Sequence, residues 1–253
     1  MDVENMSSSQ IKVVFFDAAG TLIHINGSVA DVYLKYAKNY GVQQTPDIKS
    51  AIQSAFSHAF QQAPPAIFHV SQPEKLKQCE RLWWFDIVHA VFYRVGMFER
   101  FDDYFEEIYE AFGTGLHWKA DPEVFSVLQT LKDHGYELGI ISNFDTRLFQ
   151  ILDDLALRPF FDSVTISSLV QSVKPSKQIF DFALNEHVVE PHEALHIGDS
   201  VKDDWEGAVQ AGLHAVLING TEKSLHSVQS IQSFTQLPEL LRRFSSTDDS
   251  EFN

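Results

Sequence analysis

The sequence has little cysteine, little positive charge and no long apolar run, and each shortage excludes a class of protein. Its 253 residues include one cysteine, Cys79, so the chain cannot form an internal disulfide, which is typical of a reducing cytoplasm. Lysine and arginine number 19 against 35 acidic residues, and the net charge of −16 argues against binding to nucleic acid or anionic lipid. No apolar run approaches the ~18 residues of a membrane helix, and the polar start lacks a signal-peptide pattern. We therefore expect a soluble, cytoplasmic protein; the sequence does not indicate its oligomeric state.

Strand and helix patterns alternate over most of the chain. The first strand is expected over 11–18, where "IKVVFFDA" is almost wholly apolar, as in a buried parallel sheet. After residue 118 the alternation returns, with helices expected over 121–136, 145–157, 177–188, 203–212 and 237–244, and strands over 137–143, 161–167, 193–199 and 214–220. This order predicts an α/β fold, a doubly wound Rossmann-like parallel sheet.

The block between the first strand and residue 116 is different, because it holds only helical patterns. Helices are expected over 29–41, 47–60, 73–96 and 101–113. We assign 28–115 to an inserted helical cap, 11–27 and 116–245 to the core, and 1–10 and 246–253 to flexible termini. The chain has 21 phenylalanines, and we attribute the aromatic richness of the cap to core packing rather than to an aromatic substrate.

Polar residues follow the predicted core strands where each strand ends. They are Asp17, Ser142 with Asn143, and Asp199 with Asp203 and Asp204 beyond it, while Lys174 precedes a core helix. Ligands of open α/β sheets bind at this carboxyl edge. Asp17 could attack phosphorus, and Ser142 and Asn143 could hold phosphate oxygens. Lys174 could bind the phosphate and neutralise its charge and that of Asp17. Asp17 and Asp199 could together hold Mg²⁺, a cation that prefers oxygen ligands.

Four segments in this order resemble the motifs of the haloacid dehalogenase-like hydrolase superfamily: "FFDAAGTL", "IISN", "VKPSKQIF" and "HIGDSVKDDWEGAVQAG". The helical block resembles the family's C1-type cap, and "RLWWFDIVHAVFYRVG" resembles the rhythmically expressed gene 2-like branch. The resemblance implies a nucleophile and metal ligand at Asp17, a second metal-binding acid at Asp199, and a metal ligand at the backbone carbonyl of Ala19. It also implies that Ser142 binds phosphate, that Lys174 is the third-motif lysine, and that Asp203 and Asp204 support the fourth motif.

Ala19 departs from the phosphatase pattern of this family, which has a second aspartate there as general acid and base. Such proton transfer is worth about 10²–10⁴ in rate. We therefore expect a Mg²⁺-dependent hydrolase of the phosphatase type, weak on a small phosphorylated metabolite, with His24 or Asp145 as conceivable substitutes.

Two alternatives remain open from the sequence. One is a catalytically weakened scaffold or partner-binding protein. The other is cleavage of a carbon–halogen or carbon–phosphorus bond, the latter through a Schiff base on Lys35, Lys38 or Lys49.

Overall fold

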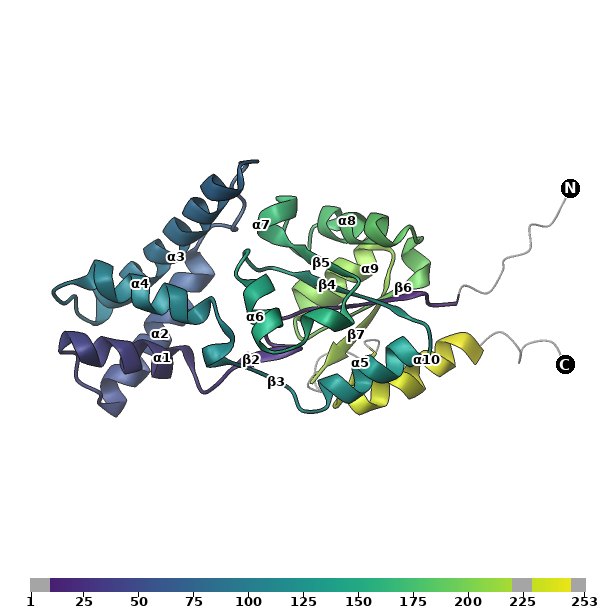
Figure 1. The fold of residues 1–253 in the computed structure, drawn as a ribbon, viewed down its shortest axis with the longest axis horizontal. Coiled ribbons are helices and arrows are strands. Elements are labelled where there is room, and N and C mark those ends of the chain that lie inside the picture. The colour runs from purple at the N-terminus through teal and green to yellow at the C-terminus, as the bar shows by residue number, and fades with distance from the viewer. Residues whose placement is uncertain (1–9, 220–228, 247–253) are drawn as a thin grey trace, which may run out of the picture.

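A six-stranded parallel sheet forms the centre of the protein, in the computed structural model that describes residues 10–219 and 229–246 (Figure 1). Its strand order is β5-β4-β1-β6-β7-β8, and every neighbouring pair is parallel. The strands are β1 (Val13–Phe16), β4 (Glu137–Ser142), β5 (Ser163–Ile166), β6 (Ala194–Gly198), β7 (His214–Ile218) and β8 (Ser230–Ile231). The predicted doubly wound α/β fold is confirmed.

Helices cover both faces of this sheet because the strands are apolar on both sides. Val14 and Phe16 of β1 belong to an apolar cluster with residues of three helices on one face, whereas Val13 and Phe15 pack with two helices on the other. The first group is α5 (Val124–Asp133), α6 (Leu148–Asp154) and α10 (Leu237–Ser246), and the second is α8 (Lys177–His187) and α9 (Gly207–Ala211). A strand buried on both faces shows no alternation, which explains the continuous apolar run of the first strand.

Four helices between β1 and the rest of the sheet form a separate layer, at the left of Figure 1. They are α1 (Val29–Ala37), α2 (Pro46–Gln62), α3 (Pro73–Val95) and α4 (Phe101–Phe112). These helices bury their own apolar cluster, which includes Tyr33, Phe92 and Tyr104. The aromatic side chains therefore build a second core, as expected. The boundaries at 27/28 and 115/116 stay a prediction.

A two-stranded antiparallel ribbon, absent from the sequence-based prediction, lies where the chain leaves the core and returns to it. β2 (Ile23–Ile25) pairs with β3 (Trp118–Ala120). Each strand has only three residues, and the whole helical layer separates them in sequence. Periodicity over so short a segment gives no usable signal, so the ribbon emerges only from tertiary pairing.

Several predicted boundaries are also wrong. The helix expected over 145–157 spans only 148–154. It begins late because Asp145 Oδ1 accepts the backbone N–H of Arg147 in a turn, and it ends before Ala156, whose φ is +56°. The helix expected from 203 begins at Val201 as a π-helical turn, Val201–Glu206. The strand expected to end at 167 ends at Ile166 and is followed by α7 (Ser167–Val170).

The proposed flexible ends, 1–10 and 246–253, lie almost entirely outside the described residues, as does the last residue of the strand expected over 214–220. Among the helices that the structure describes, none has the length and apolar character needed to cross a membrane.

Candidate active site

Asp17 lies directly after β1, at the carboxyl edge of the sheet, and only 6% of its surface is exposed. Ser142, the last residue of the adjacent β4, donates from Oγ to Asp17 Oδ1 at 3.1 Å. The Nζ atom of Lys174 donates to the same oxygen at 2.7 Å. Both bonds reach Oδ1, and within residues 10–219 and 229–246 no described hydrogen bond reaches Oδ2 of Asp17. Oδ2 is therefore the oxygen of Asp17 that is left available to a ligand.

Lys174 bridges two carboxylates and is itself held by the loop after β4. Its Nζ lies 2.7 Å from Asp17 Oδ1 and 2.6 Å from Asp204 Oδ1. Burial lowers the pKa of the ammonium, but the charges of Asp17 and Asp204 outweigh this effect and leave the pKa raised. Asn143 fixes the backbone of Lys174 through two reciprocal bonds, at 2.8 and 3.1 Å. These bonds hold the Lys174 ammonium beside Asp17.

Asp204 positions Lys174, and both oxygens of its carboxylate accept hydrogen bonds. Its Oδ1 also lies 2.9 Å from His196 Nε2, and its Oδ2 accepts the backbone N–H of Ser200 at 3.0 Å. Burial raises the pKa of Asp204, but Lys174 and then His196 outweigh it and hold the pKa well below its usual range. Gly198 makes this approach possible, since a Cβ there would lie 2.1 Å from Asp204 Cγ. The sequence did not predict that His196 helps to hold Asp204. The available signal was a histidine inside the apolar strand β6.

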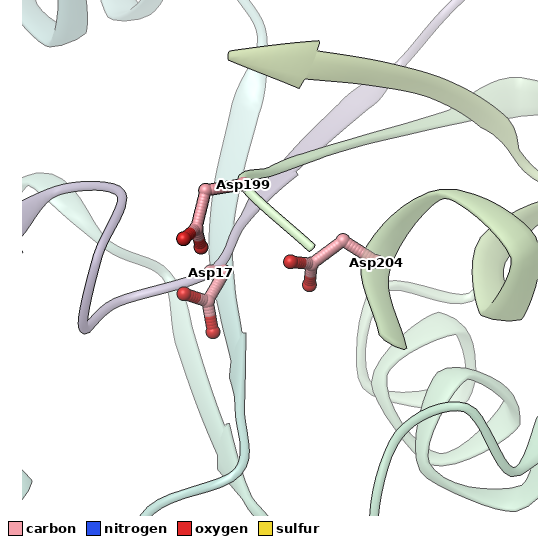
Figure 2. A group of neighbouring side chains, drawn as sticks. All are labelled: Asp17, Asp199 and Asp204. Atoms are coloured by element: carbon pink, nitrogen blue, oxygen red, sulfur yellow. The ribbon is translucent and has the colours of Figure 1, made fainter. Parts of the chain in front are cut away.

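Three carboxyl groups from separate segments converge at this edge of the sheet. One oxygen from each of Asp17, Asp199 and Asp204 lies within 4.8 Å of the others. Figure 2 shows Asp204 reaching toward Asp17 from the start of a helix, with Asp199 beside Asp17. Such a set of oxygen donors fits a hard divalent cation. Because Asp204 is bonded to Lys174, His196 and Ser200, Asp17 and Asp199 are the better placed ligands.

The environment of Asp199 favours a positive charge. Desolvation by the walls of the cleft, followed by the negative charges of Asp17 and Asp204, raises the pKa of Asp199. Thr21 Oγ1 donates to Asp199 Oδ1 at 3.2 Å. At Gly20 the backbone has φ +100°, and a Cβ would lie 2.8 Å from Asp199 Oδ2. The turn after β1 therefore needs glycine to admit this carboxylate, and a bound cation would relieve the repulsion.

The two remaining predicted site residues, Ala19 and Asp203, make no described side-chain bond to Asp17 or Lys174. Ala19 and Asp203 both line the cleft above Asp17. The backbone N–H of Asp203 donates to Ser200 Oγ at 3.1 Å as part of a helix cap. Burial, and then the charge of Asp204, raises the pKa of Asp203. Among the described contacts, none joins its carboxylate to Asp17 or Lys174. The structure thus brings six of the predicted residues into contact or close approach, namely Asp17, Ser142, Asn143, Lys174, Asp199 and Asp204, while Ala19 and Asp203 only line the cleft.

Neither conceivable substitute for the missing acid is suited to that role. Asp145 receives two bonds from Arg147, at 2.8 and 2.7 Å, and one from Trp84 Nε1 at 2.6 Å. Burial raises the pKa of Asp145, but the charge of Arg147 outweighs it and lowers the pKa overall. An acid with a lowered pKa does not hold a proton to donate. His24 lies on β2 and is not among the residues that line the cleft.

The cap lysines do not reach the cleft either. Lys49 pairs with Asp31 at 2.5 Å on the surface, and Lys35 lies over the ring of Tyr36. Neither of these, nor Lys38, is among the lining residues. Within the part of the chain that the structure describes, Lys174 is the only lysine that lines this cleft.

A cleft of about 500 Å³ opens over Asp17, between the sheet edge and the helical layer. Its floor is polar and comprises Asp17, Ser142, Lys174 and Asp199. Its roof comes from the start of α1, from α2 and α3, and from the segment between α2 and α3. The volume suits a small molecule.

Comparison with known proteins gives one family. The model of the haloacid dehalogenase-like hydrolase matches residues 11–212. Haloacid dehalogenase-like hydrolase domain-containing protein 3 of Mus musculus is 31% identical over 215 residues, 84% of either chain. The Rhythmically expressed gene 2 protein of Drosophila melanogaster is 26% identical over 228 residues, 86% of either chain, which agrees with the branch indicated by the sequence.

A solved structure supports the same assignment. The crystal structure of 2-haloacid dehalogenase from Pseudomonas syringae has a TM-score of 0.63 and 25% identity, and the match covers 93% of this chain and 100% of that one. The family model and the relatives cover most of the chain. The chain belongs to the haloacid dehalogenase-like hydrolase family.

Proposed function

We propose that the protein is a Mg²⁺-dependent phosphatase of low turnover that acts on a small phosphorylated metabolite through Asp17. The observation that carries this proposal is the bridge from Lys174 Nζ to Asp17 and Asp204, at 2.7 and 2.6 Å. A fixed ammonium beside the nucleophile favours an anionic substrate, because it offsets the repulsion between the carboxylate and a phosphate.

The proposed reaction has two steps. Oδ2 of Asp17 attacks phosphorus, the bond to the leaving oxygen breaks, and that oxygen departs with the electron pair. Ser142 Oγ and Lys174 Nζ, now hydrogen-bonded to Asp17, donate to the phosphoryl oxygens. Water then attacks phosphorus, the bond from phosphorus to Asp17 Oδ2 breaks with its electron pair returning to the carboxylate, and inorganic phosphate leaves with the proton of the water. Mg²⁺ held by Asp17 and Asp199, with the carbonyl of Ala19 as the ligand that the family resemblance implies, would neutralise phosphate charge.

Ala19 limits both steps. Its methyl group lines the cleft, where it can neither protonate the leaving oxygen nor deprotonate water. Asp145 is hydrogen-bonded to Arg147 and does not take over the role of the missing acid. We expect substrates whose leaving group departs without a proton, and we expect slow hydrolysis of the intermediate.

Cleavage of other bonds is less well supported. The dehalogenases of the family replace the metal-binding acid of the fourth motif, whereas here Asp199 lies within 4.8 Å of Asp17. A Schiff base needs a lysine in the cleft, and Lys35, Lys38 and Lys49 do not line it. The similarity to a 2-haloacid dehalogenase therefore does not decide the reaction.

A scaffold role is the second candidate, and Ala19 is the observation that favours it. A protein that binds phosphate without turning it over needs Lys174 and Ser142 but no acid. Such a protein would bind phosphate with Mg²⁺ and show no turnover that depends on Asp17.

A cytoplasmic location of the protein stays a prediction.

Hydrolysis of phenyl phosphate with Mg²⁺ tests the proposal. Asp17→Asn should abolish turnover, and Ala19→Asp should raise it by up to about 10²–10⁴. Wild-type turnover that survives Asp17→Asn refutes the role of Asp17. An unchanged rate in Ala19→Asp refutes the account of Ala19.

A further inference from the structure

The two walls of the cleft differ sharply in chemistry. Of the roof residues from the helical layer, only Glu80 is polar or charged. The others are Val29, Phe56, Phe60, Ala63, Pro64, Pro65, Ala66, Phe68, Trp83 and Trp84. The floor holds the charged side chains of Asp17 and Lys174. A bound substrate therefore meets charge at one end and apolar surface at the other.

The polar side-chain groups of this roof are already hydrogen-bonded within the protein. Trp83 Nε1 donates to the carbonyl of Pro64 at 2.8 Å, and Trp84 Nε1 donates to Asp145 at 2.6 Å. The carboxylate of Glu80 accepts both the backbone N–H and the hydroxyl of Thr146. The roof therefore offers few partners to the hydroxyl groups of a sugar, and unpaired polar groups are costly to bury.

The described lining of the cleft also offers no second positive charge to an anion. Among the described residues that line it, Lys174 is the only lysine or arginine, and its ammonium lies beside Asp17 and Asp204. Arg147 lines an adjoining cavity, but its guanidinium is paired with Asp145. A second phosphate or a carboxylate on the substrate would find no further positive charge there, and acidic groups such as Asp199 and Asp203 would repel it.

Aromatic rings form a continuous surface that faces the open space. Phe60 stacks on Phe56 at 5.6 Å between ring centroids, and lies 5.9 Å from both Trp83 and Trp84. Phe60 is 46% exposed although it is large and apolar. An apolar cavity of about 70 Å³ continues past Phe56 and Trp84. Such exposed ring faces are well suited to stack on another ring.

We propose that the substrate is an aryl phosphate, whose single anionic group lies on Asp17 and whose uncharged ring packs against Phe56, Phe60, Trp83 and Trp84. This inference rests on the proposed function and names its substrate class. An aryl phosphate also suits a site with Ala19, which cannot donate a proton to the leaving group. As the P–O bond breaks, the aryl oxygen takes the electron pair and leaves as a phenolate, which is a weaker base than an alkoxide and departs without a proton.

A matched pair of inert analogues tests the ring separately from the phosphoryl site. Phenylphosphonate and methylphosphonate carry the same headgroup and differ only in the ring. By calorimetry on the wild-type protein with Mg²⁺, phenylphosphonate should bind at least about tenfold more tightly. Phe60→Ala should remove most of that difference, with Phe60→Leu as a milder variant if the first does not fold. Phe182→Ala, an exposed phenylalanine of α8 outside the cleft, is the control and should leave the difference unchanged.

The outcomes separate the two proposals. Equal binding of the two phosphonates overturns the aryl substrate and leaves the phosphoryl site standing. An advantage of phenylphosphonate that persists in both Phe60 variants overturns the assignment of the ring site. Failure of both analogues and of inorganic phosphate to bind overturns the proposed function as well.

Discussion

Asp145 pairs with Arg147 where α3 meets the core, and replacing this aspartate with asparagine would isolate a buried positive charge. The two side chains are only 5% and 13% exposed. Two bonds of 2.8 and 2.7 Å join them, and Trp84 of α3 adds a third to the same carboxylate. Asp145→Asn keeps the shape and an acceptor for Trp84 but removes the charge.

The expected loss follows from burial. Breaking a buried ion pair by removing one partner costs about 3–5 kcal/mol, because the other charge stays desolvated. The rings of Tyr109 and Trp84, 4.1 and 5.2 Å from the Arg147 guanidinium, stabilise it in part, which favours the lower end of that range. In a protein of this size the melting temperature should fall by about 6–20 °C.

Urea denaturation of the two proteins measures this loss, and a surface pair provides the control. Arg100 and Asp103 are also 2.7 Å apart, but their side chains are 72% and 55% exposed. Asp103→Asn should cost at most about 1 kcal/mol. If the two substitutions cost the same, the reasoning from burial is refuted.

Three further outcomes are expected. Burial raises the pKa of Glu80, so the folded chain holds this proton to higher pH than the unfolded chain, and stability should fall as pH rises above the usual carboxyl range. Glu80→Gln should flatten that decline in the unfolding free energy, and an unchanged slope would contradict the assignment. Mg²⁺ should raise the melting temperature of the wild type but not of Asp199→Asn, and EDTA should abolish turnover; an equal shift in both proteins would exclude Asp199 as a ligand. Gly198→Ala should cost more than about 1 kcal/mol in urea denaturation because its Cβ would overlap Asp204, and a neutral effect would disprove that contact.

The sequence predicted the sheet because its signal is local. The apolar runs around β1, β4 and β6 and the polar residue after each strand are visible without a structure. Parallel pairing of adjacent strands then places Asp17, Ser142 and Asp199 at one edge. The ordered motifs added Lys174, whose position before α8 no periodicity reveals.

What the sequence did not predict depends on contacts between distant segments. The bond of His196 to Asp204 and the pairing of β2 with β3 have no local pattern. Asp145 was conceivable as an acid until Arg147 and Trp84 were placed against it. The aromatic residues were attributed to packing, which holds for Tyr33 and Phe92. Composition could not separate those from Phe60, which faces the cleft.

Rapid acid quench of the wild-type protein with an aryl phosphate and Mg²⁺, followed by mass spectrometry of its peptides, tests the central claim most directly. Because Ala19 cannot activate water, the covalent intermediate should accumulate, and a phosphate adduct should appear on Asp17 within the first turnover. Asp17→Asn should show none. An adduct on another residue, or steady turnover with Asp17 unmodified at every time, would contradict the account.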